Sequence, residues 1–294
     1  MKTDEINLRD PFVFVEDGVY YLYGTRAKTC WGPADGFDVY WGTDLENWDG
    51  PQEIFHNQGD FWADRNYWAP ELHKYQGKYY LFASFKNENV CRGTQILISD
   101  SPKGPFVPHS AGPVTPPDWE CLDGTFYVSK DGTPYMVFCH EWVQIRDGEV
   151  CAVPLTPDLK AAVGKPKVLF RASEASGWVK GKENYRFPGQ LCYVTDGPFM
   201  YRCENGELLI LWSGFGQEGY TEAIARSDNG DITGKWTQDE KPLFEKDGGH
   251  GMIFRKLDGE LCLTLHSPNH TPDERPKFVP IYERNGNLFL QEGR

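Results

Sequence analysis

Short apolar runs with polar interruptions recur along the whole chain of 294 residues. The first, "DPFVFVEDGVYYLYGT" from Asp10, is typical of two strands joined by a turn, with Gly18 supplying the positive φ of the hairpin. Four more copies follow along the chain: "APELHKYQGKYYLFAS" from Ala69, "DGTFYVSKDGTPYMVFC" from Asp123, "DGPFMYRCENGELLILWSG" from Asp196 and "HGMIFRKLDGELCLTLHS" from His250.

The copies start 59, 54, 73 and 54 residues apart, and most intervals contain two further strand patterns, as in "VYWGTDLENW" followed by "PQEIF". Five repeated units of four antiparallel strands predict an all-β fold, a single five-bladed β-propeller over residues 1–294. A β-sandwich does not explain the regular repetition. The longest interval predicts an insertion at residues 171–190, expected as a loop at one rim.

Because the first strand of every blade lines the channel of a propeller, the residues that open the five copies should form one ring. Aligning Pro198 with Pro11 puts Gly197 on this ring and Asp196 one position before it. The ring therefore gathers side chains of Asp10, Ala69, Asp123, Asp196 and His250. The prediction is a small acidic funnel built by separate blades.

Three neighbouring carboxyl groups cannot all ionise at their normal pKa, and spreading their pKa values lets one site supply both an acid and a base. Glycoside hydrolysis needs that combination. An isolated Asp-Gly or Asp-Pro is usually only a turn dipeptide. Three copies in register favour a catalytic site instead.

Composition narrows the possible partners. Aromatic residues make up 15% of the chain, which suits both β-strands and surfaces on which sugars stack. The formal net charge of −13 argues against a nucleic-acid partner and makes an acidic polysaccharide a poor one. Eight cysteines without a C-x-x-C pair predict reduced, buried thiols. The N-terminus "MKTDEINLRD" has no apolar signal core and no run is long enough to cross a membrane, which predicts a cytoplasmic protein without a membrane partner.

The five motifs "RDPFVF", "WAPEL", "LDGTFY", "TDGPFMYR" and "GGHGMIF" resemble the family 43 glycoside hydrolases, from Arg9 to about His266. The resemblance implies a five-bladed propeller that cleaves arabinofuranosides, xylosides and some galactans with inversion. It also implies roles for two residues. Asp10 would be the general base, and Asp123 would raise the pKa of the acid and orient it.

The fourth motif departs from the family pattern, in which the general acid is a glutamate before Gly-Pro or Ala-Pro. Here Asp196 precedes Gly197 and Pro198, and its carboxyl reaches one methylene less far. We expect Asp196 to be the acid. Glu141 in "CHEW" and Glu183 in "GKENY" are the alternatives.

The remaining candidates concern substrate and metal. Trp68, beside the second ring position, is expected as a platform under the sugar, and Arg226 as a donor to a sugar hydroxyl, although Arg226 could simply flank a strand. For Trp31, Trp142 and Trp178, packing between blades is the favoured interpretation, and a place at the rim of the pocket is the alternative. The resemblance places His250 near a structural calcium held through water. The alternative is a neutral histidine bonded to a catalytic carboxylate, and the chemistry itself requires no cofactor.

These observations predict an inverting exo-glycosidase that removes terminal α-L-arabinofuranosyl or β-D-xylosyl units from plant-derived oligosaccharides, with the oligomeric state left open. A retaining fructan-active propeller enzyme is a second possibility, and the absence of an N-D-P-N-G run counts against it. A non-catalytic sugar-binding propeller is the third, motivated by the aspartate at the position of the acid.

Overall fold

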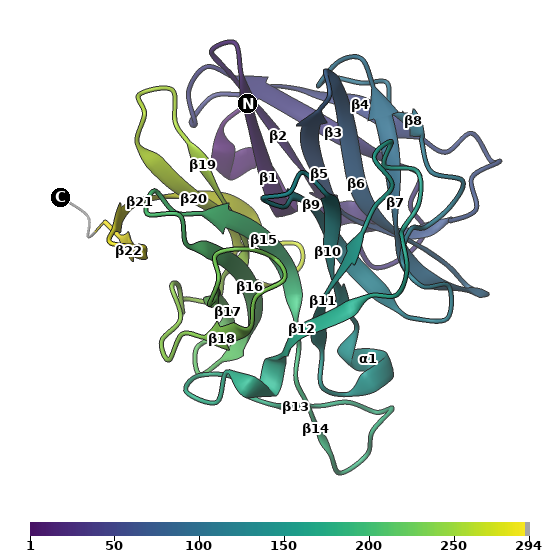
Figure 1. Cartoon of the computed structure of the whole chain (residues 1–294). Coiled ribbons are helices and arrows are strands. Elements are labelled where there is room, and N and C mark those ends of the chain that lie inside the picture. The colour runs from purple at the N-terminus through teal and green to yellow at the C-terminus, as the bar shows by residue number, and fades with distance from the viewer. Residues whose placement is uncertain (292–294) are drawn as a thin grey trace.

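Five four-stranded antiparallel sheets surround a common axis in the computed structural model, which describes residues 1–291 (Figure 1). Each sheet is built from consecutive strands. The first contains β1 (Leu8–Glu16), β2 (Val19–Arg26), β3 (Gly36–Gly42) and β4 (Asp49–His56), and the second β5 (Arg65–Tyr75), β6 (Lys78–Asn87), β7 (Val90–Ser99) and β8 (Val107–Pro108).

The other three sheets repeat this order. The third contains β9 (Cys121–Val128), β10 (Pro134–His140), β11 (Glu149–Pro154) and β12 (Lys167–Arg171). The fourth contains β15 (Asp196–Arg202), β16 (Leu208–Gly216), β17 (Gly219–Ser227) and β18 (Trp236–Gln238), and the fifth β19 (Gly249–Arg255), β20 (Leu261–Ser267), β21 (Arg275–Arg284) and β22 (Asn287–Leu290). Strands β1, β5, β9, β15 and β19 contact one another in sequence, and β19 returns to β1, which closes the ring. The predicted five-bladed β-propeller is therefore confirmed.

Every innermost strand opens with a bulge at the predicted ring position. The ring residue has a left-handed φ in all five blades, at 52° for Asp10, 45° for Ala69, 57° for Asp123, 52° for Gly197 and 55° for His250. Each bulge is accompanied by a shift in the register between the first and second strands. Four of these residues are not glycine, so a conformation that L-residues rarely adopt is repeated around the channel.

Hydrogen bonds between neighbouring blades hold these bulges. The backbone N–H of Ala69 bonds to Oγ1 of Thr25 at 2.8 Å, that of Asp123 to Oγ of Ser84 at 2.8 Å, and that of His250 to Oγ of Ser213 at 2.7 Å. The ring closes where the N–H of Asp10 bonds to Nδ1 of His266 at 3.2 Å. The second strand of each of these blades thus fixes the opening of the next one.

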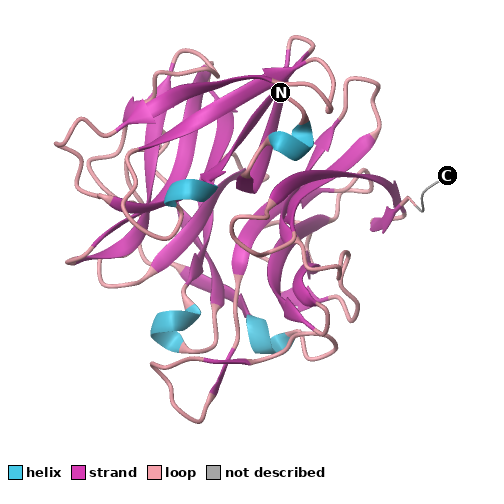
Figure 2. Ribbon diagram, turned by 180° about the vertical axis from the view of Figure 1, so that it is seen from behind, coloured by secondary structure: helices cyan, strands magenta, loops and turns pink. Residues whose placement is uncertain are grey.

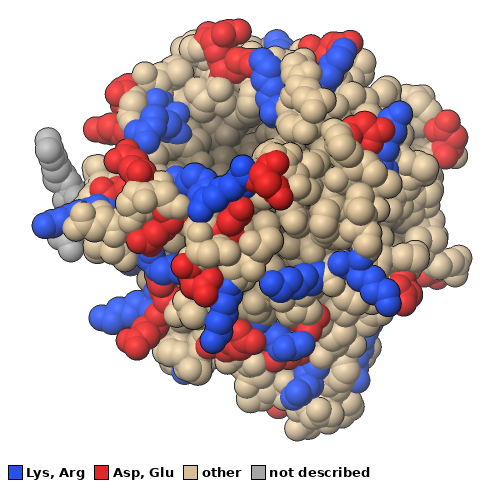
Figure 3. Space-filling model, viewed as in Figure 1, with Lys and Arg blue, Asp and Glu red and all other residues tan. Residues whose placement is uncertain are grey.

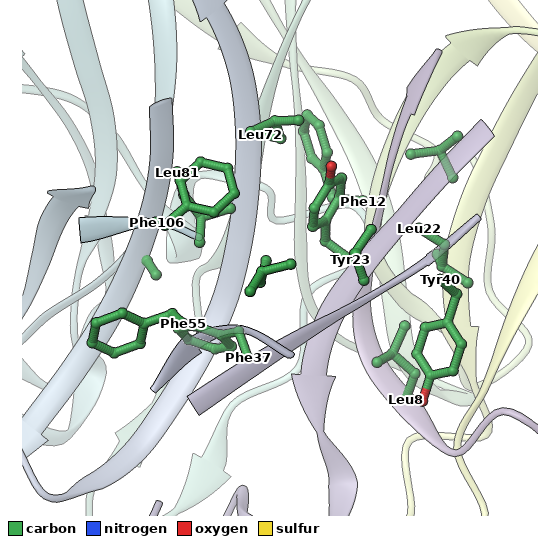
Figure 4. Close-up of a cluster of buried hydrophobic side chains, with 14 of the residues drawn as sticks. Leu8, Phe12, Leu22, Tyr23, Phe37, Tyr40, Phe55, Leu72, Leu81 and Phe106 are labelled. Carbon is green, nitrogen blue, oxygen red and sulfur yellow. The ribbon is translucent and has the colours of Figure 1, made fainter. Parts of the chain in front are cut away.

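Alternating apolar positions along the strands pack the core between blades. In the first two blades, Phe12, Tyr23, Phe37, Phe55 and Phe106 belong to one buried cluster (Figure 4). Flat aromatic side chains bury large areas at the interfaces between twisted sheets, which accounts for much of the aromatic content. Trp178 also belongs to the interior, where the centroid of its ring lies 5.1 Å from that of Trp212, so the favoured interpretation of packing is confirmed for this residue.

In the part of the chain that the structure describes, helices are confined to α1 (Trp142–Ile145) and three 3-10 turns, η1 (Thr3–Glu5), η2 (Ala27–Thr29) and η3 (Ala172–Glu174) (Figure 2). None of the helices within residues 1–291 is long and apolar enough to cross a membrane. The longest interval carries a small two-stranded sheet, β13 (Lys182–Glu183) with β14 (Leu191–Cys192). All eight cysteines are unpaired. Acidic and basic side chains are interspersed over the face seen in Figure 3.

Candidate active site

A small inner chamber of about 60 Å³ lies where the five strand openings converge. It is lined by Arg9, Asp10, Trp31, Trp68, Leu122, Asp123, Asp196, Tyr220 and His250. A wider outer pocket of about 730 Å³ shares Arg9, Trp31, Trp68, Leu122 and Asp196 with it, so the two cavities are continuous. The structure therefore brings the three predicted aspartates into one chamber.

Asp10 is surrounded by groups that favour its ionised form. Thr25 Oγ1 donates to Asp10 Oδ2 at 2.5 Å, and His250 Nδ1 lies 3.2 Å from Asp10 Oδ1. Burial opposes ionisation, but His250, Arg9, His266 and Thr25 outweigh it and hold the pKa of Asp10 below its ordinary value. Asp10 is thus a carboxylate at neutral pH, ready to accept a proton.

The pKa values of Asp123 and Asp196 are shifted in the opposite direction, above their ordinary values. Burial, followed by the charge of Asp10, raises the pKa of Asp123, although its Oδ2 accepts the N–H of Gly197 at 2.9 Å. Burial and the neighbouring Asp123 raise the pKa of Asp196 to about 7, while Tyr220 donates its hydroxyl to Asp196 Oδ2 at 3.1 Å. One chamber therefore contains an ionised carboxylate and a carboxylic acid at the same pH.

His250 lies close to both Asp10 and Asp123, since its Nδ1 also lies 3.7 Å from Asp123 Oδ2. The backbone next to His250 is held by Glu222, a fully buried residue of β17. Glu222 Oε2 accepts Ser213 Oγ at 2.6 Å and the N–H of Gly251 at 2.9 Å. The chain around His250 is therefore bonded to the fourth blade at two successive peptide groups.

The donor set around His250 gives little for a directly bound cation. Within residues 1–291, no group of three or more His, Cys, Asp or Glu side chains is arranged to hold a metal ion. The imidazole Nδ1 faces carboxylates, and calcium prefers oxygen ligands. A calcium held through water stays a prediction, and no step below is routed through it.

Aromatic side chains form part of the wall of both cavities. Trp68 and Trp31 lie edge to face, with ring centroids 5.4 Å apart, and line the chamber and the outer pocket. The Arg92 guanidinium covers one face of Trp68 at 3.5 Å. Trp142, on α1, lines only the outer pocket.

Two other predicted residues lie away from the chamber. Arg226 is bound by Asp239, at 2.7 and 2.9 Å, and by the carbonyl of Gly286 at 2.7 Å, and it lines neither cavity. Its expected contact with a sugar hydroxyl is wrong, because these partners occupy its guanidinium within the fourth and fifth blades. Glu183 is exposed on β13 and also lines neither cavity, whereas Glu141 lines the outer pocket alone.

Three residues that line the chamber or contact its carboxylates were missed from the sequence as site residues. His266 had a signal, because it takes the place in the fifth copy that Thr25, Ser84 and Ser213 take in theirs. Arg9 directly precedes the first ring position. Tyr220 follows the turn at Gly219, and nothing in its surroundings along the chain marks it.

Comparison with known proteins agrees with this geometry. The model of the family described as glycosyl hydrolases family 43 matches residues 5–285. The chain belongs to this family. The fold, the five motifs and the acidic chamber of this family 43 chain are thus explained together.

Individual relatives lie at moderate similarity. An endo-arabinase structure from Bacteroides thetaiotaomicron is 40% identical, with a TM-score of 0.89, over 97% of this chain and 98% of that one. A thermostable family-43 glycoside hydrolase shares the fold at 21% identity and a TM-score of 0.81, over 100% of this chain and 96% of that one.

A xylosidase/arabinosidase from Bacteroides ovatus is 28% identical over 143 residues, 42% of this chain and 43% of that protein. Xylosidase/arabinosidase 43A from Humicola insolens is 26% identical over 145 residues, 45% of this chain and 43% of that protein. The matches span less than half the length of these curated relatives.

Proposed function

We propose that this family 43 chain hydrolyses the glycosidic bond of terminal α-L-arabinofuranosyl units in oligosaccharides, with inversion at the anomeric carbon. Asp10 acts as general base, Asp196 as general acid, and Asp123 keeps the pKa of Asp196 high. The observation that carries the proposal is the convergence of Asp10, Asp123 and Asp196 in one chamber, where the surroundings hold the pKa of Asp10 below its ordinary value and raise that of Asp196 to about 7.

In the proposed reaction, Asp10 removes a proton from a water molecule, and that water attacks the anomeric carbon of the sugar in the inner chamber. Asp196 delivers its proton to the glycosidic oxygen as the bond to the leaving group breaks. His250, 3.2 Å from Asp10, orients the base. Each turnover consumes one water, and the two carboxyl groups return to their starting states by proton exchange with solvent.

The identity of the sugar rests on similarity. The endo-arabinase at 40% identity and the two xylosidase/arabinosidase relatives support a pentose, and the first favours arabinose over xylose. β-D-xylosyl units are therefore the second choice for the inner chamber.

Action at chain ends is supported by the shape of the cavity. Trp31 Nε1 donates to Thr271 Oγ1 at 2.9 Å, which bridges the first and fifth blades at the rim. Arg186 bonds to the carbonyl of Val143 at 3.3 Å, which bridges the insertion and the third blade. Both bridges lie at the rim of the outer pocket, and the small inner chamber behind it, which contains the three aspartates, favours a chain end over the middle of a chain. Cleavage inside a chain is the second candidate, favoured by the similarity to an endo-arabinase.

The test combines three substrates with product analysis. We expect turnover of 4-nitrophenyl α-L-arabinofuranoside, weaker turnover of the β-D-xylopyranoside, and release of arabinose alone from linear 1,5-linked arabinan. Proton NMR should show the inverted anomer first. Arabino-oligosaccharides as early products would establish internal cleavage, and calorimetric binding without turnover of any substrate would identify a non-catalytic sugar-binding protein.

A further inference from the structure

The outer pocket contains a buried ion pair that is poorly bonded within the protein. Arg92, on β7, and Glu141, which precedes α1, each have side chains only 8% exposed. Arg92 Nε lies 3.6 Å from Glu141 Oε2, longer than a hydrogen bond. Both residues line the outer pocket, between the second and third blades.

Few other partners satisfy these two groups. Among residues 1–291, the Arg92 guanidinium makes one hydrogen bond, from Nη1 to the carbonyl of Asn66 at 3.4 Å, and its Nε has none. The Glu141 carboxylate accepts no hydrogen bond from any of residues 1–291. Its burial raises its pKa, in spite of the nearby arginine. Buried charged groups are normally saturated with hydrogen bonds, so this pair has capacity for a ligand.

A neighbouring pair shows that the same wall can be saturated. Glu120 accepts Lys86 Nζ at 2.8 Å and the backbone N–H of Arg92 at 2.8 Å. The carboxylate of Glu120 is therefore occupied, although it also lines the outer pocket. Arg92 and Glu141 therefore differ from the neighbouring pair, because they retain unused hydrogen-bonding groups.

The place of the pair relative to Asp196 determines what it would bind. Asp196 lines both cavities, so the glycosidic oxygen that it protonates lies at their boundary. The leaving group then occupies the outer pocket, a step that rests on the proposed function. A guanidinium that donates and a carboxylate that accepts together match two adjacent hydroxyl groups of a sugar.

We infer that Arg92 and Glu141 form the binding site for the leaving sugar, the unit next to the scissile bond, through a pair of its hydroxyl groups. Arg92 is held against Trp68 at 3.5 Å, and this stacking fixes the plane of its guanidinium. Glu141 is thereby a substrate-binding residue and not the general acid. The pair selects oligosaccharides over simple glycosides whose leaving group has no adjacent hydroxyls.

The experiment compares Glu141→Gln with the wild-type chain on three substrates: arabinobiose, methyl α-L-arabinofuranoside and 4-nitrophenyl α-L-arabinofuranoside. We expect kcat/KM for arabinobiose to fall about tenfold or more, mainly through KM, equivalent to about 1.4 kcal/mol of lost binding. Both simple glycosides should stay within about twofold. Arg92→Lys should give the same split, and Glu183→Gln, the control at an exposed carboxylate that lines neither cavity, should give none.

The methyl glycoside separates binding from acid catalysis, because its poor leaving group needs protonation and offers no sugar hydroxyls. A parallel fall on arabinobiose and the methyl glycoside would overturn the inference in favour of an acid role, and unchanged values on all three would overturn it too.

If the wild-type chain cleaves none of the three, the proposed function fails independently. Calorimetry with arabinobiose then decides the inference: weaker binding to Glu141→Gln than to wild type supports it, and equal or undetectable binding overturns it.

Discussion

The first and second blades open with the same backbone and different chemistry. Asp10 and Ala69 have φ values of 52° and 45°, both precede proline, and both donate their N–H to the second strand of the preceding blade. One carries a carboxylate and the other a methyl group. The left-handed opening therefore belongs to the construction of the propeller, because it occurs whether or not the side chain reacts.

Thr25 connects these two openings. Its hydroxyl donates to Asp10 Oδ2 and accepts the N–H of Ala69, so one side chain serves the catalytic opening of its own blade and the structural opening of the next. A substitution confined to one of the two openings should therefore show whether that opening contributes to activity or to folding.

The largest effect is expected when the first opening is given the side chain of the second. Asp10→Ala should lower kcat on an aryl arabinofuranoside by about 10³-fold or more, because the general base is lost. The fold should persist, since alanine already adopts this conformation at position 69. Ala69→Gly is the matched control, with activity near wild type. Activity of Asp10→Ala within tenfold of wild type would refute the role of Asp10.

The next effect concerns the fourth opening, where the carboxyl group lies one residue before the ring. Because the raised pKa of Asp196 is about 7, the acid loses its proton as pH rises through that value, and kcat/KM should fall above about pH 7. Asp196→Asn should remove this alkaline limb and lower the rate on methyl α-L-arabinofuranoside by about 10²-fold or more. The rate on the 4-nitrophenyl glycoside should fall less. An unchanged alkaline limb in the variant would assign it to another group.

A smaller effect is expected from cutting the link between the two openings. Thr25→Val removes a donor that lowers the pKa of Asp10, so the acidic limb of the pH–rate profile should move to higher pH. It also leaves the buried N–H of Ala69 unpaired, which should lower the free energy of unfolding by about 1–3 kcal/mol. Thr25→Ser should restore both. A Thr25→Val profile that overlays wild type would show that Asp10 does not depend on this bond.

The smallest effect on activity is expected at an arginine outside both openings. Arg226→Gln should lower the melting temperature, because its bonds to Asp239 and the Gly286 carbonyl are lost. Values of kcat and KM should stay within about twofold of wild type. A selective rise in KM would place Arg226 in contact with substrate after all.

Repeats in the amino-acid sequence were sufficient to predict the architecture and the positions of the carboxylates. Five copies of a strand–turn–strand pattern specify five blades, since each local hairpin is encoded by nearby residues, and alignment of Pro198 with Pro11 correctly put Gly197 on the ring. Because the blades repeat around a common axis, equivalent positions in the five copies lie side by side around the channel. Asp10, Asp123 and Asp196 meet in this way because all three lie on or beside the repeated bulge.

The side chains outside the repeat that face the cavities could be identified only from the folded chain. Tyr220 reaches Asp196 from a third strand, and Arg92 and Glu141 approach each other from different blades. Trp178 packs in the interior, and Arg226 bonds to the Gly286 carbonyl away from both cavities. These outcomes depend on contacts between segments distant in sequence, which no local pattern encodes. Strand periodicity tells which face a residue occupies, whereas the neighbour it meets there is set by the packing of one twisted blade against the next.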